Sequence, residues 1–264
     1  MSDRLAGKVA LIAGSASGMG RAGAILMAEQ GASVVFADLN ADQAQIEADR
    51  LQQRGLKAAA IQLDVADPQQ TRDAVEFTIE TFGRIDVLHN NAAIFSRDVA
   101  ADQVTDIGHL DVAVFDRIMA VNVRGVFLTV REGARRMIAA GSPETGRGRV
   151  IIISSITATA IGPGLGLYGA SKAASLQLGR TLARDWIRKG VNVNILCPGY
   201  METELNADWF HTEGGQKQIA TWPRRRLMGA EALDDMLLYL ASDASRYVTG
   251  SVMTVDDGQS LTGS

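Results

Sequence analysis

A tyrosine and a lysine four residues apart, Tyr168 and Lys172, form the pair in this 264-residue chain best suited to move a proton. Residues at positions i and i+4 share one face of a helix, so the phenol and the ammonium can enter the same site. A phenol with a pKa of about 10 is a poor base at neutral pH, and a nearby fixed cation favours its phenolate form. Lowering that pKa by about two to three units requires about 3–4 kcal/mol, of which a close, partly desolvated ammonium can supply a large part.

A serine at the end of an expected strand completes a candidate catalytic set. The apolar run Val150–Ile153 delivers Ser155, which lies 13 residues before Tyr168. A hydroxyl at that place can donate to a carbonyl oxygen, or hold an alcohol, while the tyrosine transfers the proton. A Tyr-x-x-x-Lys pair taken alone is common on solvated helix faces, so this context is what favours catalysis.

A glycine-rich stretch, GSASGMG at residues 14–20, directly follows an expected first strand and precedes an expected helix. Glycines let the backbone approach a pyrophosphate, and a helix N-terminus presents unpaired N–H groups with a partial positive charge. The pattern G-x-G-x-x-G also occurs, from Gly18 to Gly23, but it begins four residues after the strand. We therefore prefer a loop that starts at Gly14, and Gly23 can then allow close helix–sheet packing. An ordinary tight turn is the alternative.

An acidic residue, Asp38, ends the expected second strand, 18 residues after the last glycine of the loop. A carboxylate at this position accepts hydrogen bonds from the adenosine ribose hydroxyls. It would repel a 2′-phosphate by about 4 kcal/mol per unit-charge pair at about 4 Å, for an effective dielectric constant of about 20 and before screening. Its neighbours Phe36, Leu39 and Asn40 carry no positive charge. The sequence therefore favours NAD(H) over NADP(H), with capping of the next helix as the alternative role of Asp38.

Short apolar runs alternate with longer amphipathic segments along the whole chain. Strands buried on both faces are continuously apolar, as most of these runs are. The expected strands are Val9–Ala13, Ser33–Ala37, Ala58–Leu63, Ile85–Leu88, Val150–Ile153, Val191–Leu196 and Val252–Val255. The expected helices are Gly20–Gln30, Ala41–Arg54, Pro68–Phe82, Val112–Ala140, Gly169–Lys189 and Ala230–Ser242. This alternation predicts a single α/β domain over residues 1–264, with a doubly wound, mostly parallel seven-stranded sheet of Rossmann type and helices on both faces.

Turn residues and loops mark the boundaries of these elements. Asp67 followed by Pro68 is typical of a helix N-cap, and glycines fall where helix C-caps belong, at Gly31, Gly55, Gly83 and Gly190. Three segments are expected to be loops, at 92–111, 141–149 and 198–229. The last and longest is the predicted substrate lid. Its Trp209, Phe210 and Trp222 can line an apolar pocket or anchor the lid by packing, and Arg224–Arg226 can bind an anionic substrate or remain solvated or contact another subunit.

Composition excludes several classes of protein. A chain that is 47% hydrophobic and 21% charged, with mean hydropathy +0.05, is not disordered. The single cysteine, Cys197, allows no intrachain disulfide and predicts a reducing compartment. A net charge of −4 argues against a nucleic-acid or anionic-membrane surface. Because no apolar run approaches 18 residues and the first residues lack a signal peptide's hydrophobic region, we expect a cytoplasmic protein; three scattered histidines predict no metal site.

From about Gly7 to Gly258 the motifs and their order resemble the short-chain dehydrogenase/reductase family. The family's T-G-x-x-x-G-x-G corresponds to residues 13–20, its acidic NAD selector to Asp38, and its adenine-contacting aspartate to Asp64, followed by Val65. Its N-N-A-G reads Asn90-Asn91-Ala92-Ala93, and its N-x-x-G reads Asn122-Val123-Arg124-Gly125. The serine, Y-x-A-S-K and P-G-x-x-x-T elements fall on Ser155, Tyr168–Lys172 and residues 198–203. Two departures are visible: Ala13 lacks the threonine hydroxyl that helps fix the turn, and the methyl group of Ala93 can constrict the wall beside the ribose.

The resemblance implies a catalytic set of Asn122, Ser155, Tyr168 and Lys172. Tyr168 would be the general acid/base, and Lys172 would lower its pKa and hold the nicotinamide ribose. Ser155 would orient the substrate oxygen, and Asn122 would interrupt its long helix and hold a relay water. The implied cofactor is NAD, and its expected contacts are Gly14, Ser17, Gly18, Met19, Gly20, Asp38, Leu39, Asp64, Val65, Asn91, Ala92, Ala93, Tyr168, Lys172, Pro198, Gly199, Met201 and Thr203.

The function that this resemblance implies is NAD-dependent interconversion of a small-molecule secondary alcohol and its ketone. One alternative is a 3-oxoacyl thioester reductase, for which NADP would be usual and against which Asp38 argues. Another is a non-catalytic dinucleotide-binding scaffold, which would be expected to lose Tyr168 or Lys172. The family also implies a homotetramer that pairs the helices 112–140 and 169–189, and the apolar positions expected to be exposed there are Val126, Val130, Leu176 and Leu178.

Overall fold

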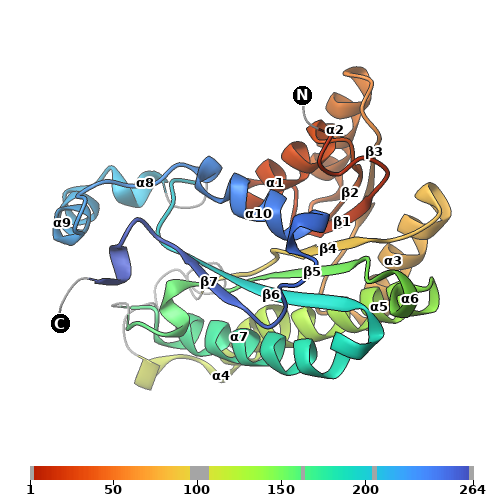
Figure 1. The fold of residues 1–264 in the computed structure, drawn as a ribbon. Helices are drawn as coiled ribbons and strands as arrows, with labels where there is room; N and C mark the ends of the chain where they lie inside the picture. Colours follow the sequence, from red (N-terminus) through yellow and green to blue (C-terminus); the bar gives the residue numbers. More distant parts are fainter. Residues whose placement is uncertain (1–2, 96–106, 162–163, 204–206, 262–264) are drawn as a thin grey trace.

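Seven parallel strands form the centre of the molecule (Figure 1). The computed structural model describes residues 3–95, 107–161, 164–203 and 207–261. The sheet has the order β3-β2-β1-β4-β5-β6-β7, and each neighbouring pair is parallel. The strands are β1 Val9–Ala13, β2 Ser33–Asp38, β3 Ala58–Gln62, β4 Val87–Asn90, β5 Gly148–Ile153, β6 Val191–Pro198 and β7 Val252–Val255. The predicted doubly wound, seven-stranded single-domain fold is confirmed.

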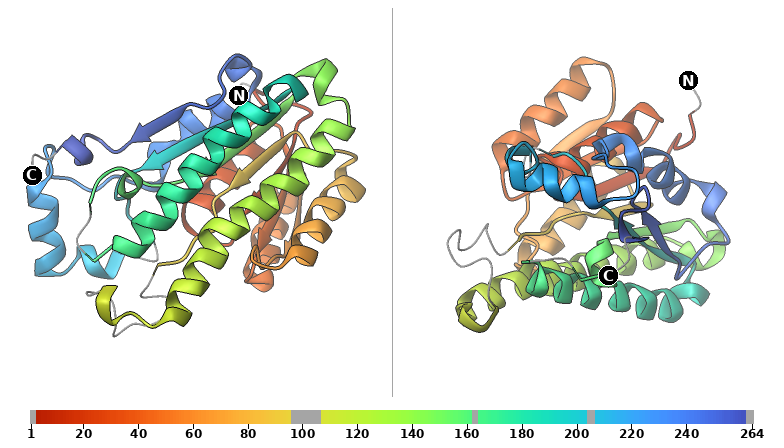
Figure 2. Two further views of the ribbon diagram at one scale, coloured as in Figure 1. Left: turned by 90° about the horizontal axis from the view of Figure 1, so that it is seen from below. Right: turned by 90° about the vertical axis from the view of Figure 1, so that its left-hand side faces the viewer.

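Helices cover both faces of this sheet and make three layers (Figures 1 and 2). The helices α1, α2 and α10 lie on one face, and α3, α5 and α7 lie on the other. Their bounds are α1 Gly18–Glu29, α2 Ala41–Gln53, α3 Pro68–Phe82, α4 Val112–Met119, α5 Val126–Ala139, α6 Ser142–Thr145, α7 Gly166–Trp186, α8 Ala207–Phe210, α9 Glu213–Thr221 and α10 Asp234–Ala241. None of the helices within the described residues is both long enough and apolar enough to cross a bilayer.

Each sheet face carries its own apolar core, which explains the continuous apolar runs. Ile12 and Phe36 face the α1–α2–α10 side, while Leu11 and Val35, their neighbours in the strands, face the other. All four are buried. Because successive side chains point to opposite faces, a strand covered on both sides must be apolar at every position. The edge strand β7 differs, since exposed and half-buried residues alternate along it.

The structure corrects several expected boundaries. Strand β4 is Val87–Asn90 and not Ile85–Leu88, because two polar residues, His89 and Asn90, continue the ladder beside β1 and β5. The expected loop 141–149 contains α6 and the first two residues of β5. The expected loop 198–229 contains α8 and α9, and part of 92–111 lies outside the described residues.

Local signals explain other boundaries. Asp67 caps α3 by accepting bonds from the N–H groups of Gln69 and Gln70, and Gly83 ends this helix with φ +83°. The expected helix 112–140 is interrupted, as the resemblance implied, by a π-helical segment, Ala120–Gly125, that contains Asn122. Such wide turns inside α-helices occur frequently at functional sites.

The apolar side chains predicted to be exposed on the long helices are not the ones that the structure exposes. Val126 and Val130 are only 3% and 0% exposed, because they point into the core, so their predicted exposure is wrong. Leu176 and Leu178 of α7 are half-buried against the same core. The large apolar side chains that are exposed on α4 and α5 are Val112, Phe115 and Phe127.

Candidate active site

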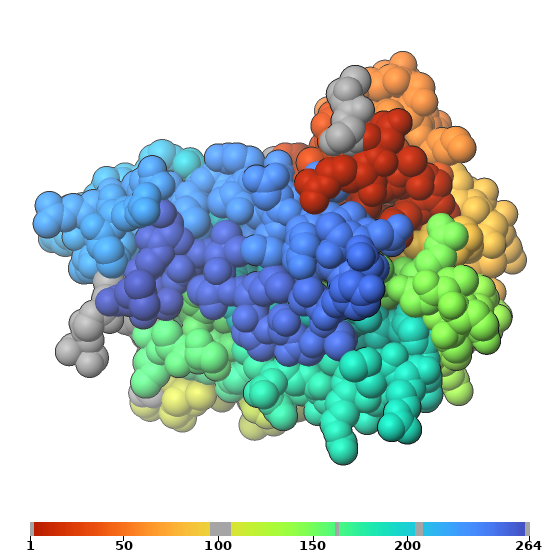
Figure 3. Space-filling view, viewed as in Figure 1, coloured from red at the N-terminus to blue at the C-terminus, as the bar shows by residue number. Residues whose placement is uncertain are grey.

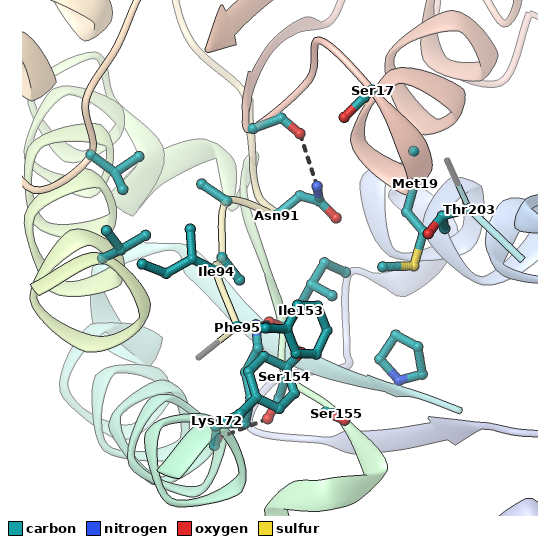
Figure 4. A pocket seen from close by; sticks show the side chains of 18 of the residues that line it. Ser17, Met19, Asn91, Ile94, Phe95, Ile153, Ser154, Ser155, Lys172 and Thr203 are labelled. Carbon is teal, nitrogen blue, oxygen red and sulfur yellow. Dashed lines mark hydrogen bonds between the residues drawn. The ribbon is translucent and has the colours of Figure 1, made fainter. Parts of the chain in front are cut away.

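A cavity of about 370 Å³ opens at the carboxyl ends of the strands. Ligands bind in open α/β sheets at this edge, where the strand order reverses, which here is between β1 and β4. In Figure 4, Ser17 and Met19 lie toward one end of the cavity, Lys172 and Ser155 toward the other, and Asn91 between them. The predicted site residues that line it are Gly14, Ser17, Gly18, Met19, Asp38, Leu39, Asp64, Val65, Asn91, Ala92, Ala93, Ser155, Tyr168, Lys172, Pro198, Gly199, Met201 and Thr203. Two predicted site residues, Gly20 and Asn122, do not line it.

The glycine loop is built by close backbone approaches. Gly14 has φ +78°, and a Cβ atom there would lie 2.6 Å from the Cα atom of Ala92. A Cβ atom on Gly20 would lie 1.9 Å from the carbonyl oxygen of Gly14. Gly20 therefore packs closely against the turn and does not line the cavity. The carbonyl of Ala13 accepts bonds from the N–H groups of Asn91 and Ala92, at 3.0 and 2.9 Å, and so ties this turn to the end of β4.

The start of α1 fits a pyrophosphate. Ser17 occupies the N-cap position, but its side chain makes no capping hydrogen bond, and no acidic residue lies in the first turn. The N–H groups and partial positive charge of this helix end are therefore suited to an anion. Asn91 donates from Nδ2 to the carbonyl oxygen of Gly14 at 2.8 Å, while its buried Oδ1 has no hydrogen-bond partner among the described residues.

The end of the cavity beside β2 and β3 carries two fixed carboxylates. Asp38 accepts the N–H of Ala16 at 2.9 Å and that of Asn40 at 3.0 Å, which holds the carboxylate at the cavity wall. Asp64 accepts the N–H of Ala66 at 2.9 Å. Its other oxygen lies 3.5 Å from a guanidinium nitrogen of Arg117, a cavity residue on α4 that the sequence reasoning missed. Since a carboxylate has about four acceptor positions, both aspartates can accept further bonds.

The opposite end holds the tyrosine and the lysine. Tyr168 and Lys172 both lie on α7 and are 8% and 2% exposed. The Lys172 ammonium donates to the carbonyl oxygen of Ile153 at 2.9 Å and lies 5.5 Å from the centroid of the Tyr168 ring. Burial lowers the pKa of Lys172 to about 8, because a cation loses hydration inside the protein. The lysine is therefore still mainly protonated at pH 7.

Ser155 follows the end of β5 and lies at the same end of the cavity as Tyr168 and Lys172. Its hydroxyl oxygen accepts the N–H of Thr157 at 3.1 Å and the Thr157 hydroxyl at 2.9 Å, which caps a 3-10 turn at Ile156–Ala158. Neither bond uses the hydroxyl proton of Ser155. The serine is thus oriented by its neighbours and retains a donor for a ligand.

Asn122 lies behind the cavity wall. Its Nδ2 donates to the carbonyl oxygen of Ile94 at 2.9 Å and to the Ser171 hydroxyl at 3.0 Å, and its Oδ1 accepts the N–H of Ile94 at 2.9 Å. These bonds tie the segment after β4 to α7. Both Nδ2 hydrogens are thus engaged, and Oδ1 keeps one acceptor position beyond its bond from Ile94.

The cavity also has an apolar wall that the sequence reasoning missed. The Phe95 ring stacks on the Tyr168 ring, with centroids 4.2 Å apart and planes 22° apart. Ile156, Leu165 and Tyr200 also line the cavity. The motifs held a signal for two of these residues, since Phe95 closely follows Asn90–Ala93 and Tyr200 lies inside the P-G-x-x-x-T element.

The aromatic residues of segment 198–229 pack on one another. Phe210 and Trp222 are 3% and 5% exposed and contact the Tyr200 ring, so they do the packing that was one of their two expected roles. Trp209 is 47% exposed. Arg224 and Arg226 form ion pairs with Asp257. Among the residues that the structure describes, no group of three or more His, Cys, Asp or Glu side chains is placed to hold a metal ion.

Comparison with known proteins agrees with this geometry. A family model described as enoyl-(acyl carrier protein) reductase matches residues 13–260. The chain is 32% identical to cyclohexanol dehydrogenase of an Acinetobacter species over 256 residues, which cover 97% of this chain and 96% of that one.

Solved structures are similar over nearly the whole chain. A gluconate 5-dehydrogenase from Burkholderia cenocepacia, in complex with NADP and tartrate, is 32% identical, with TM-score 0.89 and coverage of 99% of both chains. A 7α-hydroxysteroid dehydrogenase with NADH and 7-oxo glycochenodeoxycholic acid is also 32% identical, with TM-score 0.88, covering 98% of this chain and 96% of that one. With the glycine loop, the Tyr168–Lys172 pair and Ser155 meeting at one cavity, these matches show that the chain belongs to the short-chain dehydrogenase/reductase family of oxidoreductases.

Proposed function

We propose that this protein is an NAD(H)-dependent oxidoreductase that interconverts a secondary alcohol and its ketone. The observation that carries the proposal is one cavity with Asp38 and the glycine loop toward one end, and Tyr168, Lys172 and Ser155 at the other. Such a cavity suits a dinucleotide whose reactive ring lies beside a proton-transfer group.

Each catalytic residue has a task in the oxidation direction. The Ser155 hydroxyl holds the oxygen of the alcohol, and the Tyr168 phenolate accepts its proton. The Lys172 ammonium stabilises that phenolate and holds the nicotinamide ribose. A bound nicotinamide would supply the hydride acceptor for the carbinol carbon, so that the substrate would lose a hydride in addition to the proton that Tyr168 takes. Asn122 keeps Ile94 and Ser171 in place behind these groups.

The preference for NAD rests on Asp38. Its carboxylate would accept bonds from the adenosine ribose hydroxyls, and Ser17 and Met19 would meet the pyrophosphate. The residues around Pro198–Thr203 that line the cavity would hold the nicotinamide half. One structural neighbour contains NADP and another contains NADH, so the fold accommodates both dinucleotides. The charge of Asp38 is what favours NAD in this chain.

An apolar body is the proposed feature of the substrate. Phe95, Ile156, Leu165 and Tyr200 offer apolar surface close to Tyr168. Two proteins of similar sequence or fold carry names of cyclic alcohol dehydrogenases, which makes cyclic secondary alcohols the first compounds to try. A 3-oxoacyl thioester reductase is the second candidate, because the matching family model is described as an acyl carrier protein reductase.

An absorbance assay at about 340 nm, the band of the reduced nicotinamide, tests the proposal with cyclic and acyclic secondary alcohols and either NAD or NADP. We expect turnover with NAD and a cyclic secondary alcohol, and its loss in Tyr168→Phe. Unchanged turnover in Tyr168→Phe would refute the mechanism. Faster reduction of a 3-oxoacyl thioester with NADPH than oxidation of any alcohol with NAD would favour the second candidate.

We further propose a cytoplasmic homotetramer with the segment 198–229 as a cover of the substrate end. The single buried thiol, Cys197, suits a reducing compartment. The exposed apolar side chains Val112, Phe115 and Phe127 suit pairing of long helices between subunits.

A further inference from the structure

The C-terminal turn of residues 256–260 holds the main chain of a cavity residue, Tyr200. The Tyr200 N–H donates to Oε1 of Gln259 at 2.6 Å, and Nε2 of Gln259 donates to the Tyr200 carbonyl oxygen at 3.1 Å. Gln259 is 4% exposed. The turn itself is fixed because Asp256 accepts the N–H groups of Gly258 and Ser260. The backbone position of Tyr200 is thus set by residues almost 60 positions later in the chain.

The ring of Tyr200 is held separately, from the far end of segment 198–229. It stacks on Trp222, with centroids 5.2 Å apart and planes 19° apart, and meets the edge of Phe210 at 5.9 Å. Tyr200 lines the cavity, whereas Trp222 and Phe210 do not. The Trp222 ring therefore sets the position of the Tyr200 ring in the wall together with Phe210 and a side-chain hydrogen bond with Gln218.

The chain just after Trp222 is tied back to the C-terminal turn by one carboxylate. Arg224 Nε lies 3.1 Å from Oδ1 of Asp257, and Arg226 Nε donates to Oδ2 at 2.6 Å. Asp257 keeps 14% of its side-chain surface exposed. Its hydrogen bond from Arg226 holds the pKa of the carboxyl below its ordinary value, so both oxygens remain available to the arginines. The space-filling view shows the C-terminal residues, in dark blue, beneath the lighter blue region that includes α9 (Figure 3).

Backbone strain is concentrated at the same contact. Within the described residues, Arg225 and Asp257 are the two non-glycine residues with positive φ, at +49° and +50°. Aspartate tolerates this conformation better than arginine does. Such conformations persist when surrounding contacts impose them, and they gather at functional sites. Here Asp257 is the acidic member of both ion pairs, and Arg225 lies between the two paired arginines in the chain.

We propose that Asp257 is a positioning residue for the substrate wall, which it controls through Arg224, Arg226 and Trp222. Asp257 and Gln259 hold Tyr200 from two sides. Gln259 fixes the main chain of Tyr200, and Asp257 fixes its side chain through Trp222. Tyr200 then sets the size of the apolar body that fits beside Tyr168. The expected effect of Asp257 on kinetics rests on the proposed function. Its expected effect on structure rests on the geometry alone.

Hydrogen–deuterium exchange tests the structural part without any substrate. Asp257→Asn removes the charge but keeps a residue type that accepts positive φ. We expect peptides that contain Tyr200 or Trp222–Arg226 to exchange about two- to fivefold faster, since exposed ion pairs contribute little each. Arg226→Gln removes one of the two ion pairs by changing the arginine instead of the aspartate, and it should also speed exchange in these peptides. The matched control is Glu213→Gln, which breaks the 2.6 Å pair with Lys217 on α9 and should leave these peptides unchanged.

Steady-state kinetics tests the consequence for substrates. The ratio of kcat/KM for cyclohexanol to that for decahydro-2-naphthol measures how strictly the wall selects size. In Asp257→Asn we expect this ratio to move about two- to fivefold toward the larger alcohol, mainly through KM. Asp257→Glu, which keeps the charge, should recover part of the selectivity. NADH affinity, measured by fluorescence titration, should stay at the wild-type value because Gln259 still holds the Tyr200 main chain.

The outcomes separate this inference from the proposed function. Exchange that stays at the wild-type rate in both Asp257→Asn and Arg226→Gln would overturn it. Faster exchange in these variants but not in Glu213→Gln would support the inference, even if no alcohol were oxidised. The absence of alcohol oxidation would count only against the proposed function. Turnover with unchanged size selectivity in Asp257→Asn would overturn the link from Asp257 to Tyr200.

Discussion

The ammonium of Lys172 lies 5.5 Å from the centroid of the Tyr168 ring, on the same helix and almost wholly out of contact with solvent. A charge in this environment interacts more strongly with a neighbouring phenol than it would in water, because the effective dielectric constant is lower. The same burial disfavours the cation and lowers the pKa of Lys172 to about 8. The arrangement that suits the proposed proton transfer therefore has a cost in stability.

Replacing Lys172 with methionine should stabilise the fold while it abolishes turnover. The pKa falls from 10.5 to about 8, which corresponds to about 3 kcal/mol of destabilisation below pH 8. Loss of the bond to Ile153 offsets part of this, so we expect the free energy of unfolding at pH 7 to rise by about 1–3 kcal/mol in Lys172→Met. Urea denaturation measures this value, with Lys57→Met, on an exposed lysine, as control.

The pH dependence of that difference has a definite sign. Between pH 8 and 10.5 the unfolded chain binds more protons at Lys172 than the folded chain does, so wild-type stability rises through this window. The advantage of Lys172→Met should therefore shrink above pH 8. A Lys172→Met variant less stable than wild type at pH 7 would show that the buried ammonium is compensated by its surroundings.

Tyr168→Phe should lower kcat by about 10²–10⁴-fold, the usual contribution of a general acid or base. The substitution removes one oxygen and keeps the aromatic ring that stacks on Phe95. We therefore expect the melting temperature and the affinity for NADH to change little, which separates a lost proton-transfer group from a damaged fold. Calorimetry and a fluorescence titration with NADH provide these two controls. A large fall in NADH affinity would instead assign Tyr168 mainly to cofactor binding.

Asp38→Ser should shift the cofactor preference toward NADP. The carboxylate is held in place by the N–H groups of Ala16 and Asn40, so its repulsion of a 2′-phosphate cannot be relieved by turning away. Screening reduces the Coulomb term, and we expect the ratio of kcat/KM for NADP to that for NAD to rise about 10- to 100-fold. Asp42→Ser, on the exposed first turn of α2, is the matched control. A wild-type enzyme that already prefers NADP would contradict the role given to Asp38.

The sequence predicted elements that depend on local signals, and it failed where tertiary contacts decide. The Asp67–Pro68 start of α3 was placed correctly because cap chemistry is local. The end of β4 was missed because His89 and Asn90 are polar, and only pairing with β1 and β5 makes them strand residues.

The same distinction between local signals and tertiary contacts applies to the residues of the candidate site. Motif residues such as Gly14 and Asp38 line the cavity because the strand ends bring them to one edge of the sheet. Gly20 and Asn122 belong to motifs but act from behind the wall, through a close approach and through hydrogen bonds. The contact between Tyr200 and Gln259 joins distant parts of the chain, and nothing in their spacing could have predicted it.

Light scattering should give a mass near four times the 28.1 kDa of the chain. The helices α5 and α7 lie side by side on one face of the molecule (Figure 2), and Phe115 and Phe127 are 46% and 39% exposed. Burying such side chains against another subunit removes apolar surface from water. Phe127→Glu should therefore lower the mass at a given concentration, whereas Val130→Ala, inside the core, should affect stability first. A 28.1 kDa species for the wild type would contradict the proposed tetramer.

His89 should make the protein sensitive to acid. This residue of β4 is 0% exposed and packs beside Gly23 of α1, and neither ring nitrogen has a hydrogen-bond partner within the described residues. Burial lowers the pKa of His89 from 6.5 to about 4. Between these values the unfolded chain binds more protons than the folded chain does, so stability is lost as the pH falls below 6.5.

The size of this effect can be isolated with His89→Leu, which removes the titrating ring and keeps an apolar side chain. From the two pKa values, wild type should lose about 2 kcal/mol of unfolding free energy between pH 7 and pH 5 that His89→Leu does not lose. Urea denaturation at both pH values measures the difference, and His211→Leu, on a side chain that is 71% exposed, is the control. If wild type and His89→Leu lost stability equally, the folded protein would have to protonate His89 as readily as the unfolded chain does. That requires a proton acceptor beside the ring, which none of the described residues supplies.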